Sequence, residues 1–520
     1  MTDQTAPPPQ GRPQQGPPAW VAPEGVTGRR AWAALAVVLV GTFMALLDTT
    51  IVNVALPTIR DSIDADEATL AWIVSGYALA YGLLLIPAGR VGDRYGHKWV
   101  FVVGLAVFTL ASLAAGLASD PGQLIVARVV QGFGGGIFFP PVTALIQLLF
   151  PPAKRGAAFA IMGAVIGVST ALGPLIGGLL IEALGDENGW RWIFAVNIPI
   201  GVVGVIAAIV VIPAVRAGED AATDILGLLL LAAGISAILV PLIQGQDEGW
   251  PLWTFLSLAG GVLLLLLFWL WESRLERRGV SPLVPPRLFS HPQFTGGTLL
   301  AMIYFAAFTS VFFVIALLWQ TGLGHSALEA GLLTVPFALG NIAGAPLSDR
   351  IAQRLGRGVL LIGTALVALG LVGVWLVLVL VPAGELTSWQ FLGPLAAAGL
   401  GNGLFIAPNA RFIVATVDRA EAGAASGVIG TVQRIGSAIG IAVVSSVLFA
   451  IADVDDVAAD VQAALPQGAQ PSQAQIDQAT ASVLADHFVP AATASLALSV
   501  LFALVAFALV FALPKRVSLH

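Results

Sequence analysis

Long apolar segments recur along the whole chain, and each is long enough to cross a bilayer as a helix of about 20 residues. We count fourteen in the 520 residues, at about 31–57, 67–88, 98–118, 122–149, 156–182, 190–213, 222–243, 251–272, 294–320, 327–347, 358–381, 389–411, 421–450 and 489–513. These runs are too continuous for barrel strands, and a helix satisfies its own backbone in lipid. Only 10% of the residues are charged, against about 25% in soluble domains. The sequence therefore predicts an all-α polytopic protein of the cell membrane with 14 transmembrane helices.

The basic residues predict how the chain is oriented. An even number of spans puts both termini on one side, and nearly all Lys and Arg residues fall on that side. Only Arg60 and Arg191 fall on the other side, while Arg128 and Arg434 lie within spans. Because positive charge favours the cytoplasmic side, we expect both termini there. Residues 1–30 are rich in Pro and Gln and are expected to form a disordered cytoplasmic tail, and 514–520 a second, short one.

One long polar segment, 451–488, separates the last two spans. It contains neither Lys nor Arg, carries several Asp residues and is rich in Ala and Gln. Its position predicts an extracellular loop that can hold a short helix. Two interpretations stay open: a solvated loop, or a gate that gathers cations by its negative charge.

Several functional classes are disfavoured by what the sequence lacks. The chain has no cysteine, and its five histidines have no metal-ligand spacing, so no metal site is expected. The glycines from Gly132 to Gly136 lie inside an expected span rather than after a strand, which excludes a nucleotide fingerprint. No nucleophile–base pair is evident, so we expect neither enzymatic activity nor a cofactor. An ion gradient is then the expected energy source. The expected partners are protons, a small-molecule substrate and the lipid bilayer, without nucleic acid, and the chain is expected to act as a monomer.

A short glycine- and charge-containing loop occurs twice. The first copy joins the second and third spans and contains Gly89, Asp93, Arg94 and Gly96. A looser copy joins the tenth and eleventh spans, where Ser348-Asp349-Arg350 precedes Gly356-Arg357. Glycines permit tight turns and close helix approach. Two such loops, one in each half, indicate the internal duplication common in transporters.

With these motifs the chain resembles the major facilitator superfamily, in its fourteen-helix drug:proton antiporter branch. Five stretches carry the resemblance, in order: Leu47–Pro57, Gly89–Lys98, Arg128-x-x-Gln131-Gly132-x-Gly134, Gly163–Gly178 and Trp190–Gly201. The resemblance implies two six-helix bundles, at 31–213 and 294–513, around a central cavity. The region 214–293 would add two transmembrane helices outside that core. The implied activity is export of hydrophobic or amphipathic drugs or natural products in exchange for protons, by alternating access.

An acidic and a basic residue inside the first bundle are the candidates for proton coupling. At 1.5 Å per residue, Asp48 lies about 14 Å and Arg128 about 10 Å from the outer ends of their helices. Charged side chains at such depth usually serve ion or proton pathways. A nearby guanidinium favours the ionised carboxylate, so pairing and separation could alternate with proton release and uptake. A static salt bridge between the two helices is the alternative.

Other residues are candidates for substrate or coupling contacts. Arg434 lies near mid-membrane and could bind an anionic group, a carboxylate of another helix, or a structural partner. Glu329 falls in the first turn of the tenth helix, where it could cap the helix or meet a cationic substrate. The remaining candidates are polar or aromatic residues within spans: Asn53, Gln131, Tyr304, Phe308, Phe312, Asn402 and Asn409. The aromatic members could line a pocket for apolar ligands, or pack within a bundle.

The fifth span combines small residues at near four-residue spacing with Gly173-Pro174. Small faces permit close packing and the proline bends the helix. We expect Gly173 and Pro174, with the two loops, to control the conformational change. Two rival functions stay open: a proton-coupled uptake symporter on the same scaffold, and a membrane sensor that transports nothing.

Overall fold

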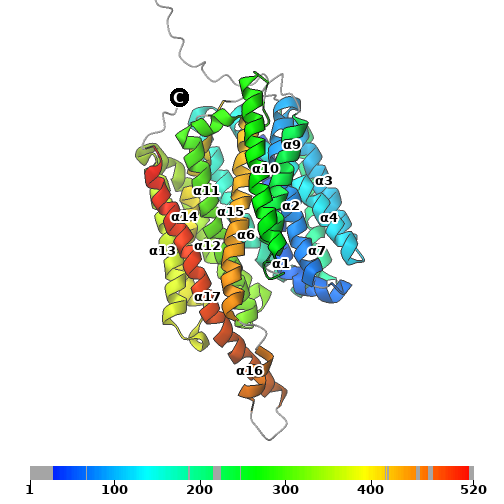
Figure 1. The fold of residues 1–520 in the computed structure, drawn as a ribbon, viewed down its shortest axis with the longest axis vertical. Helices are drawn as coiled ribbons and strands as arrows, with labels where there is room; N and C mark the ends of the chain where they lie inside the picture. Colours follow the sequence, from blue (N-terminus) through cyan, green and yellow to red (C-terminus); the bar gives the residue numbers. More distant parts are fainter. Residues whose placement is uncertain are drawn as a thin grey trace, which may run out of the picture.

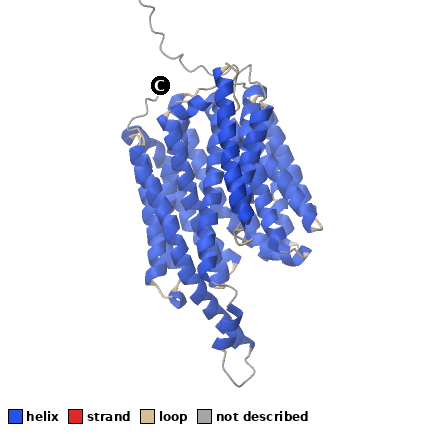
Figure 2. Ribbon diagram, in the orientation of Figure 1, coloured by secondary structure: helices blue, strands red, loops and turns tan. Residues whose placement is uncertain are grey.

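The computed structural model describes residues 27–514, apart from 66, 186–187, 215–223, 246–247, 281, 416, 419–420, 453–456 and 466–471. The expected tails therefore lie almost entirely outside the described residues. Within them the chain forms helices and short connections, and no strand (Figure 2). Fourteen helical stretches are long and apolar enough to cross a membrane, which agrees with the predicted number and fold class.

The first half of the chain contributes eight helices. They are α1 (Gly28–Ile63), α2 (Glu67–Tyr95), α3 (His97–Leu117), α4 (Pro121–Phe138), α5 (Pro140–Leu149), α6 (Pro152–Leu184), α7 (Gly189–Ala195) and α8 (Asn197–Val211). Two expected spans are thus each divided into two helices. Pro140 lacks an amide hydrogen and its ring clashes with the preceding turn, which explains the break between α4 and α5. Pro199 lies in the first turn of α8, where a missing donor needs no partner.

The second half follows two intervening helices. The pair is α9 (Ile225–Gln244) and α10 (Leu252–Arg277). The remaining helices are η1 (Pro286–Ser290), α11 (Pro292–Leu317), η2 (Leu318–Gly322), α12 (Ala327–Leu355), α13 (Gly358–Leu380), η3 (Ala383–Glu385), α14 (Ser388–Val414), α15 (Ala422–Ala452), α16 (Val457–Ala464) and α17 (Gln473–Ala512). The long helices run side by side, and α16 projects from one end of the molecule (Figure 1).

The final helix corrects the predicted extracellular loop. We expected 451–488 to be a loop and the last span to begin near 489, but α17 already begins at Gln473 and α16 occupies part of the remainder. Ser472 and Gln475 form a reciprocal cap at the start of α17. Alanine has the highest helix propensity, so this Ala-rich stretch continues the helix beyond its apolar part. The acidic residues at 453–456 lie outside the described residues.

Contacts between helix ends show that α1 begins on the same side on which α17 ends, which we call the terminal side. Arg30 at the start of α1 donates to the carbonyl of Val211 at the end of α8. Trp32 of α1 packs on Phe150, just before α6, and Asp349 at the end of α12 lies against Gly156 in the first turns of α6. Arg357, which follows α12 and precedes α13, donates to the carbonyl of Phe511 near the end of α17. The first and the last described helix therefore have their outer ends on one side, as an even number of spans requires.

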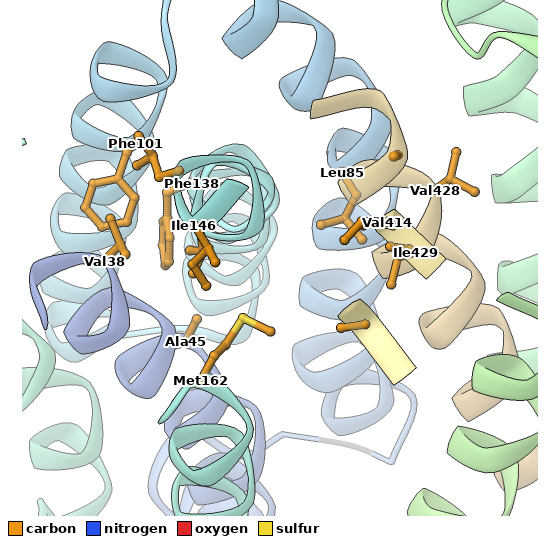
Figure 3. Close-up of a cluster of buried hydrophobic side chains, with 14 of the residues drawn as sticks. Val38, Ala45, Leu85, Phe101, Phe138, Ile146, Met162, Val414, Val428 and Ile429 are labelled. Carbon is orange, nitrogen blue, oxygen red and sulfur yellow. The ribbon is translucent and has the colours of Figure 1, made fainter. Parts of the chain in front are cut away.

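Small residues let the helices of the first half approach closely. A Cβ on Gly104 of α3 would lie 2.9 Å from the carbonyl oxygen of Gly134 of α4. Around this contact Phe101 and Phe138 pack edge to face, with ring centroids 5.6 Å apart (Figure 3). Without a hydrophobic drive between helices in lipid, such close packing holds them together.

The intervening helices α9 and α10 pack on each other, and α9 packs on α2 of the first half and on α15 of the second. A Cβ on Gly261 of α10 would lie 2.7 Å from the Ile238 side chain of α9. Leu239 of α9 lies against Gly82 of α2. Much of α10 is exposed and apolar, including Leu256, Leu263, Leu266 and Leu270. Such a surface is suited to lipid rather than to water.

Candidate functional site

Asp48 lies at the centre of the first half, where side chains from two other helices converge on it. Its carboxylate is fully buried in α1. Arg128 Nη1 of α4 lies 2.6 Å from Asp48 Oδ2, and Gln131 Nε2 lies 2.9 Å from Oδ1. Asn197 Nδ2 of α8 donates to the same Oδ1 at 3.0 Å. The ionised carboxylate therefore receives three side-chain hydrogen bonds, one of which is also an ion pair.

The guanidinium of Arg128 is held from several directions. Its Nε donates to the Ile73 carbonyl of α2 at 3.1 Å, and its Nη1 also lies 2.7 Å from Gln131 Oε1. The ring of Tyr77 lies beneath it, with the guanidinium carbon 4.2 Å from the ring centroid. Gln131 in turn donates to Ser112 Oγ of α3 at 2.8 Å. Residues of α2, α3 and α4 thus position one buried cation against the Asp48 carboxylate of α1.

This arrangement has a defined chemical consequence. A buried charge is costly unless it is paired and hydrogen-bonded, and Asp48 is both. Protonation of Asp48 would remove the ion pair, while Arg128 stays charged at any physiological pH. The carbonyl of Ile73 and the amide oxygen of Gln131 would still accept from it. The pair can therefore separate without leaving the guanidinium unsolvated.

Sequence reasoning expected Asp48, Arg128 and Gln131 here, and the structure brings all three together. It missed the roles of Asn197 and Ser112. Asn197 was visible only as part of the Trp190–Gly201 motif. The break before α8 places its side chain toward α1, which the linear pattern does not reveal.

A second chain of hydrogen bonds runs through the other half of the molecule. Tyr304 of α11 donates to Asn402 Oδ1 of α14 at 2.6 Å, and Asn402 donates to Asn341 Oδ1 of α12 at 2.8 Å. Asn341 then donates to the Ala164 carbonyl of α6 at 3.2 Å. All three side chains are buried. Asn341, which sequence reasoning missed, therefore links the second half to the glycine-rich helix of the first.

The aromatic candidates pack against other rings. Tyr304 stacks on Phe405, with ring centroids 3.9 Å apart. Phe308 and Phe312 both contact Phe337, at 5.5 and 5.0 Å between centroids. Tyr304 and Phe308 are buried in the core of the second half. The structure shows these rings packed within the second half. Contact between them and a substrate stays a prediction.

The remaining substrate candidates do not join the Asp48 site. Arg434 of α15 lies over the ring of Tyr81, 4.2 Å from its centroid, and no carboxylate among the described residues forms an ion pair with it. Glu329 forms a reciprocal cap with Ser326 at the start of α12 and is exposed. Asn409 donates to the Gly297 carbonyl at 3.3 Å. The side chain of Asn53 lies outside the described part.

The expected loop 89–98 is helical apart from Gly96, because α2 continues to Tyr95 and α3 begins at His97. Its residue Asp93 joins the two halves on the terminal side. Asp93 accepts from the backbone amides of Gly423 and Ala424, at 3.0 and 3.3 Å, at the start of α15. A carboxylate is favourable at a helix N-terminus, where the amides are otherwise unpaired. A Cβ on Gly89 would overlap the Gly423 carbonyl, so this approach needs a glycine.

Other residues of this loop shape the turn. Gly96 separates α2 from α3 with a φ of 97°, a conformation that favours glycine. His97 Nε2 lies 3.3 Å from Asp93 Oδ1. Arg94 is half-buried, with its guanidinium over the ring of Tyr95.

The second copy of the motif makes a comparable contact, in which an acidic residue of the second half lies against the first half. Asp349 at the end of α12 accepts from Arg411 of α14 at 2.8 Å. Its carboxylate also lies against Gly156 in the first turns of α6. Arg350 is exposed. Both acidic residues of the repeated loop therefore lie where the two halves meet.

Gly173 lies at the contact between α6 and α1. A Cβ there would overlap Thr50 Oγ1 and lie 3.0 Å from the Ile51 amide nitrogen. Pro174 lies inside α6, and Gly331 of α12 packs against the backbone of Pro174 and Leu175. The predicted Gly-Pro site thus contacts both halves. Its contact on α1 is Thr50, two residues after Asp48.

Replacing Gly173 with Ala is expected to destabilise the α1–α6 contact by about 1–3 kcal/mol, since overpacking forces backbone shifts. Gly163→Ala on the same helix is the control, because its Cβ would meet its nearest atoms at 3.5 Å. Thermal unfolding of the purified variants measures the difference. Equal melting temperatures would show that α1 and α6 are not held this closely.

The fold and the site together define a class: a polytopic α-helical membrane transporter whose first half has a buried ion pair at its centre. The family model of the Major Facilitator Superfamily matches residues 38–225 and 220–441. The chain belongs to this superfamily, as its motifs predicted. The superfamily consists of transporters, which agrees with the expectation that the chain is not an enzyme.

Curated relatives cover most of the chain. It is 37% identical to the probable actinorhodin transporter of Streptomyces coelicolor, over 87% of this chain and 79% of that protein. It is 36% identical to the cephamycin export protein of Amycolatopsis lactamdurans, over 81% and 86%. The tetracenomycin C resistance and export protein of Streptomyces glaucescens is 34% identical, over 82% and 78%. These similarities support the drug antiporter branch.

Solved structures show the same fold at low sequence identity. The human organic anion transporter MFSD10 superposes with a TM-score of 0.62 at 15% identity, covering 92% of this chain and 99% of that one. The proton:xylose symporter XylE superposes with a TM-score of 0.60 at 15% identity, covering 92% and 95%.

Proposed function

We propose that this protein is a proton-coupled antiporter that exports hydrophobic or amphipathic natural products by alternating access. The Asp48–Arg128 pair is the observation on which the proposal depends. Export is supported by similarity to proteins named as antibiotic exporters. The charge distribution supports a cytoplasmic terminal side, and the chain is proposed to work as a monomer in the cell membrane.

The proposed proton step takes place at Asp48. A proton from outside neutralises the carboxylate and breaks its ion pair with Arg128. Gln131 and Asn197 can then reorient, because both donate to the carboxylate that has lost its charge. The side-chain hydrogen bonds that tie α4 and α8 to α1 are then weakened. Proton binding and release would in this way favour different packings of the first half.

The two halves would separate and close at the contacts on the terminal side. Asp93 fixes the start of α15 to the end of α2, while α6 packs along α12. Opening to the cytoplasm requires the Asp93 contacts to break. The hydrogen bond from Asn341 to α6 lies on the same moving interface. Substrate would bind between the halves from the cytoplasm or the inner leaflet.

The charge of the embedded residues limits the substrate class. Within the described spans, Asp48 is paired with Arg128, while no carboxylate pairs with Arg434. A strictly cationic substrate is therefore not required, and neutral or anionic compounds are compatible with the site. Relatives whose names mention actinorhodin, cephamycin and tetracenomycin C support natural products as a class.

Replacing Asp93 with Asn is expected to shift the population toward the state open on the terminal side. Hydrogen bonds to a charged group contribute about 1.5–3 kcal/mol, so losing the charge weakens both contacts to α15. The chain has no cysteine, which permits spin labels at Tyr95→Cys and Leu355→Cys, two exposed positions on opposite halves. Electron-spin distance measurements should show a longer separation in the variant, and an unchanged distribution would contradict the role of Asp93.

Reconstituted vesicles with an imposed pH gradient test the proposed function. Protein oriented with its terminal side outward should accumulate dyes or apolar antibiotics when the vesicle interior is acidic, and should release protons in exchange. A gradient of about 100 mV supports about forty-fold accumulation for one proton. Movement of substrate with protons in the same direction would favour the uptake symporter. Absence of any gradient-dependent flux across a broad panel would favour the sensor.

A further inference from the structure

Two acidic side chains lie together on the intervening helices, remote in sequence from Asp48: Glu272 is buried and Asp224 is half-buried. Asp224 precedes α9 as its N-cap, and Glu272 lies near the end of α10. Asp224 accepts from the Gly227 amide at 3.0 Å and from Trp271 Nε1 at 2.9 Å. Glu272 is fully buried, and its Oε2 accepts from the Val284 amide at 2.7 Å.

The other oxygen of Glu272 has no hydrogen-bond partner among the described residues. It faces Asp224 across the bare Cα of Gly227. A Cβ on that glycine would lie 2.6 Å from Glu272 Oε1 and closer still to Asp224 Oδ2. Two carboxylates that share a buried site cannot both be ionised without a large cost. A proton held between them would give Oε1 its missing partner and remove one charge.

The charged groups around Asp224 and Glu272 also favour one bound proton. Arg90 of α2 interacts electrostatically with Glu272, and also with Asp93, Glu421 and Arg287. Arg287 pairs with Glu421, and His97 lies beside Asp93. Burial raises the pKa of Glu421, which the Arg287 guanidinium opposes. Asp418 and Glu276 also interact electrostatically with Arg287. Carboxylates thus outnumber the two guanidinium groups, and one bound proton brings the cluster closer to neutrality.

We propose that Asp224 and Glu272 form a proton-binding site in which the two carboxylates share one proton, distinct from the site at Asp48. The ligand is a proton, and no other group is needed to complete the geometry. This inference goes beyond the proposed export function, because export needs only Asp48. It gives the intervening helix pair a chemical role of its own.

The position of the site connects it to the contact between the halves. Glu272 holds the linker at Val284, and three residues later Arg287 holds Glu421. Glu421 directly precedes the start of α15, whose amides Asp93 caps. Loss of the shared proton would leave two adjoining anions beneath this linker. The proton therefore stabilises the linker that leads from α10 to the capped helix.

Infrared spectroscopy of the full-length protein in lipid nanodiscs tests the site directly. The wild type should show the carbonyl band of a buried protonated carboxylic acid, and Asp48→Asn should retain it. Glu272→Gln should lose the band, while Glu276→Gln, one turn further along α10, should not. A band that persists in a protein carrying both Asp48→Asn and Glu272→Gln would overturn the proposal.

Thermal stability gives an independent readout that does not depend on transport. A site that binds its proton only when folded adds stability at low pH and loses it as the pH rises. The melting temperature of the wild type should therefore fall relative to that of Glu272→Gln as the pH is raised. Asp224→Asn, which keeps an N-cap residue, should behave like Glu272→Gln. Parallel profiles for the wild type and both variants would contradict a shared proton.

Discussion

Replacing Asp48 with Asn is expected to abolish proton-driven accumulation of substrate. Asparagine keeps an acceptor for Gln131 and Asn197 but cannot gain or lose a proton in the physiological range. Accumulation in vesicles should fall from about forty-fold, the limit for one proton at about 100 mV, to about one. Downhill movement of substrate without a pH gradient should persist, because the variant retains the substrate path.

The matched control is Asp120→Asn. Asp120 is the exposed N-cap of α4, the helix that carries Arg128, and asparagine serves equally well at that position. This variant should accumulate substrate like the wild type. Elution profiles of both variants establish that each is folded. If Asp48→Asn supports undiminished proton-driven accumulation, proton coupling takes place elsewhere in the chain.

Replacing Arg128 with Ala is expected to give the largest loss of stability among single substitutions at the site. It leaves the Asp48 carboxylate buried without its countercharge, and breaking a buried pair in this way costs about 3–5 kcal/mol. It also removes the donor to the Ile73 carbonyl and the cation over Tyr77. Thermal unfolding in detergent or nanodiscs should show a clearly lower melting temperature.

A second substitution separates the lost ion pair from lost packing. Adding Asp48→Asn to Arg128→Ala removes the orphaned charge and should recover part of the stability, which a double-mutant cycle measures. Arg191→Ala is the comparison for losing a guanidinium, since Arg191 donates to the carbonyls of Gly116 and Ala118 rather than to a carboxylate. Additive effects of the two site substitutions would show that Asp48 and Arg128 do not stabilise each other.

The helical architecture was readable from the sequence because transfer into lipid is a local property of each segment. Fourteen apolar runs predicted fourteen spans, and the described residues contain fourteen helical stretches long and apolar enough to cross a membrane. Hydropathy did not indicate the divisions at Pro140 and Val196, where single spans form two helices, or the start of α17 at Gln473, well before its apolar part. Hydropathy reports burial in lipid and is insensitive to a helix that continues into water.

The composition of the candidate site was only partly readable. Depth along each helix predicted that Asp48 and Arg128 could meet, because residue number fixes height in the membrane at about 1.5 Å per residue. It did not predict Asn197 or Asn341. Whether a side chain faces a partner depends on the rotation of its helix and on the packing of its neighbours, which no single segment encodes.

The sequence by itself therefore determined the class of the protein, the number of its spans and the depth of its embedded charges. These properties follow from the free-energy cost of placing each residue in hydrocarbon, and that cost can be summed for each segment separately. The tertiary structure alone decided which polar groups converge on Asp48, how Asp93 fixes the start of α15, and that Glu272 faces Asp224. Those contacts join residues far apart in the chain, and they depend on how whole helices pack, with glycines allowing the close approach at Asp93 and between Asp224 and Glu272.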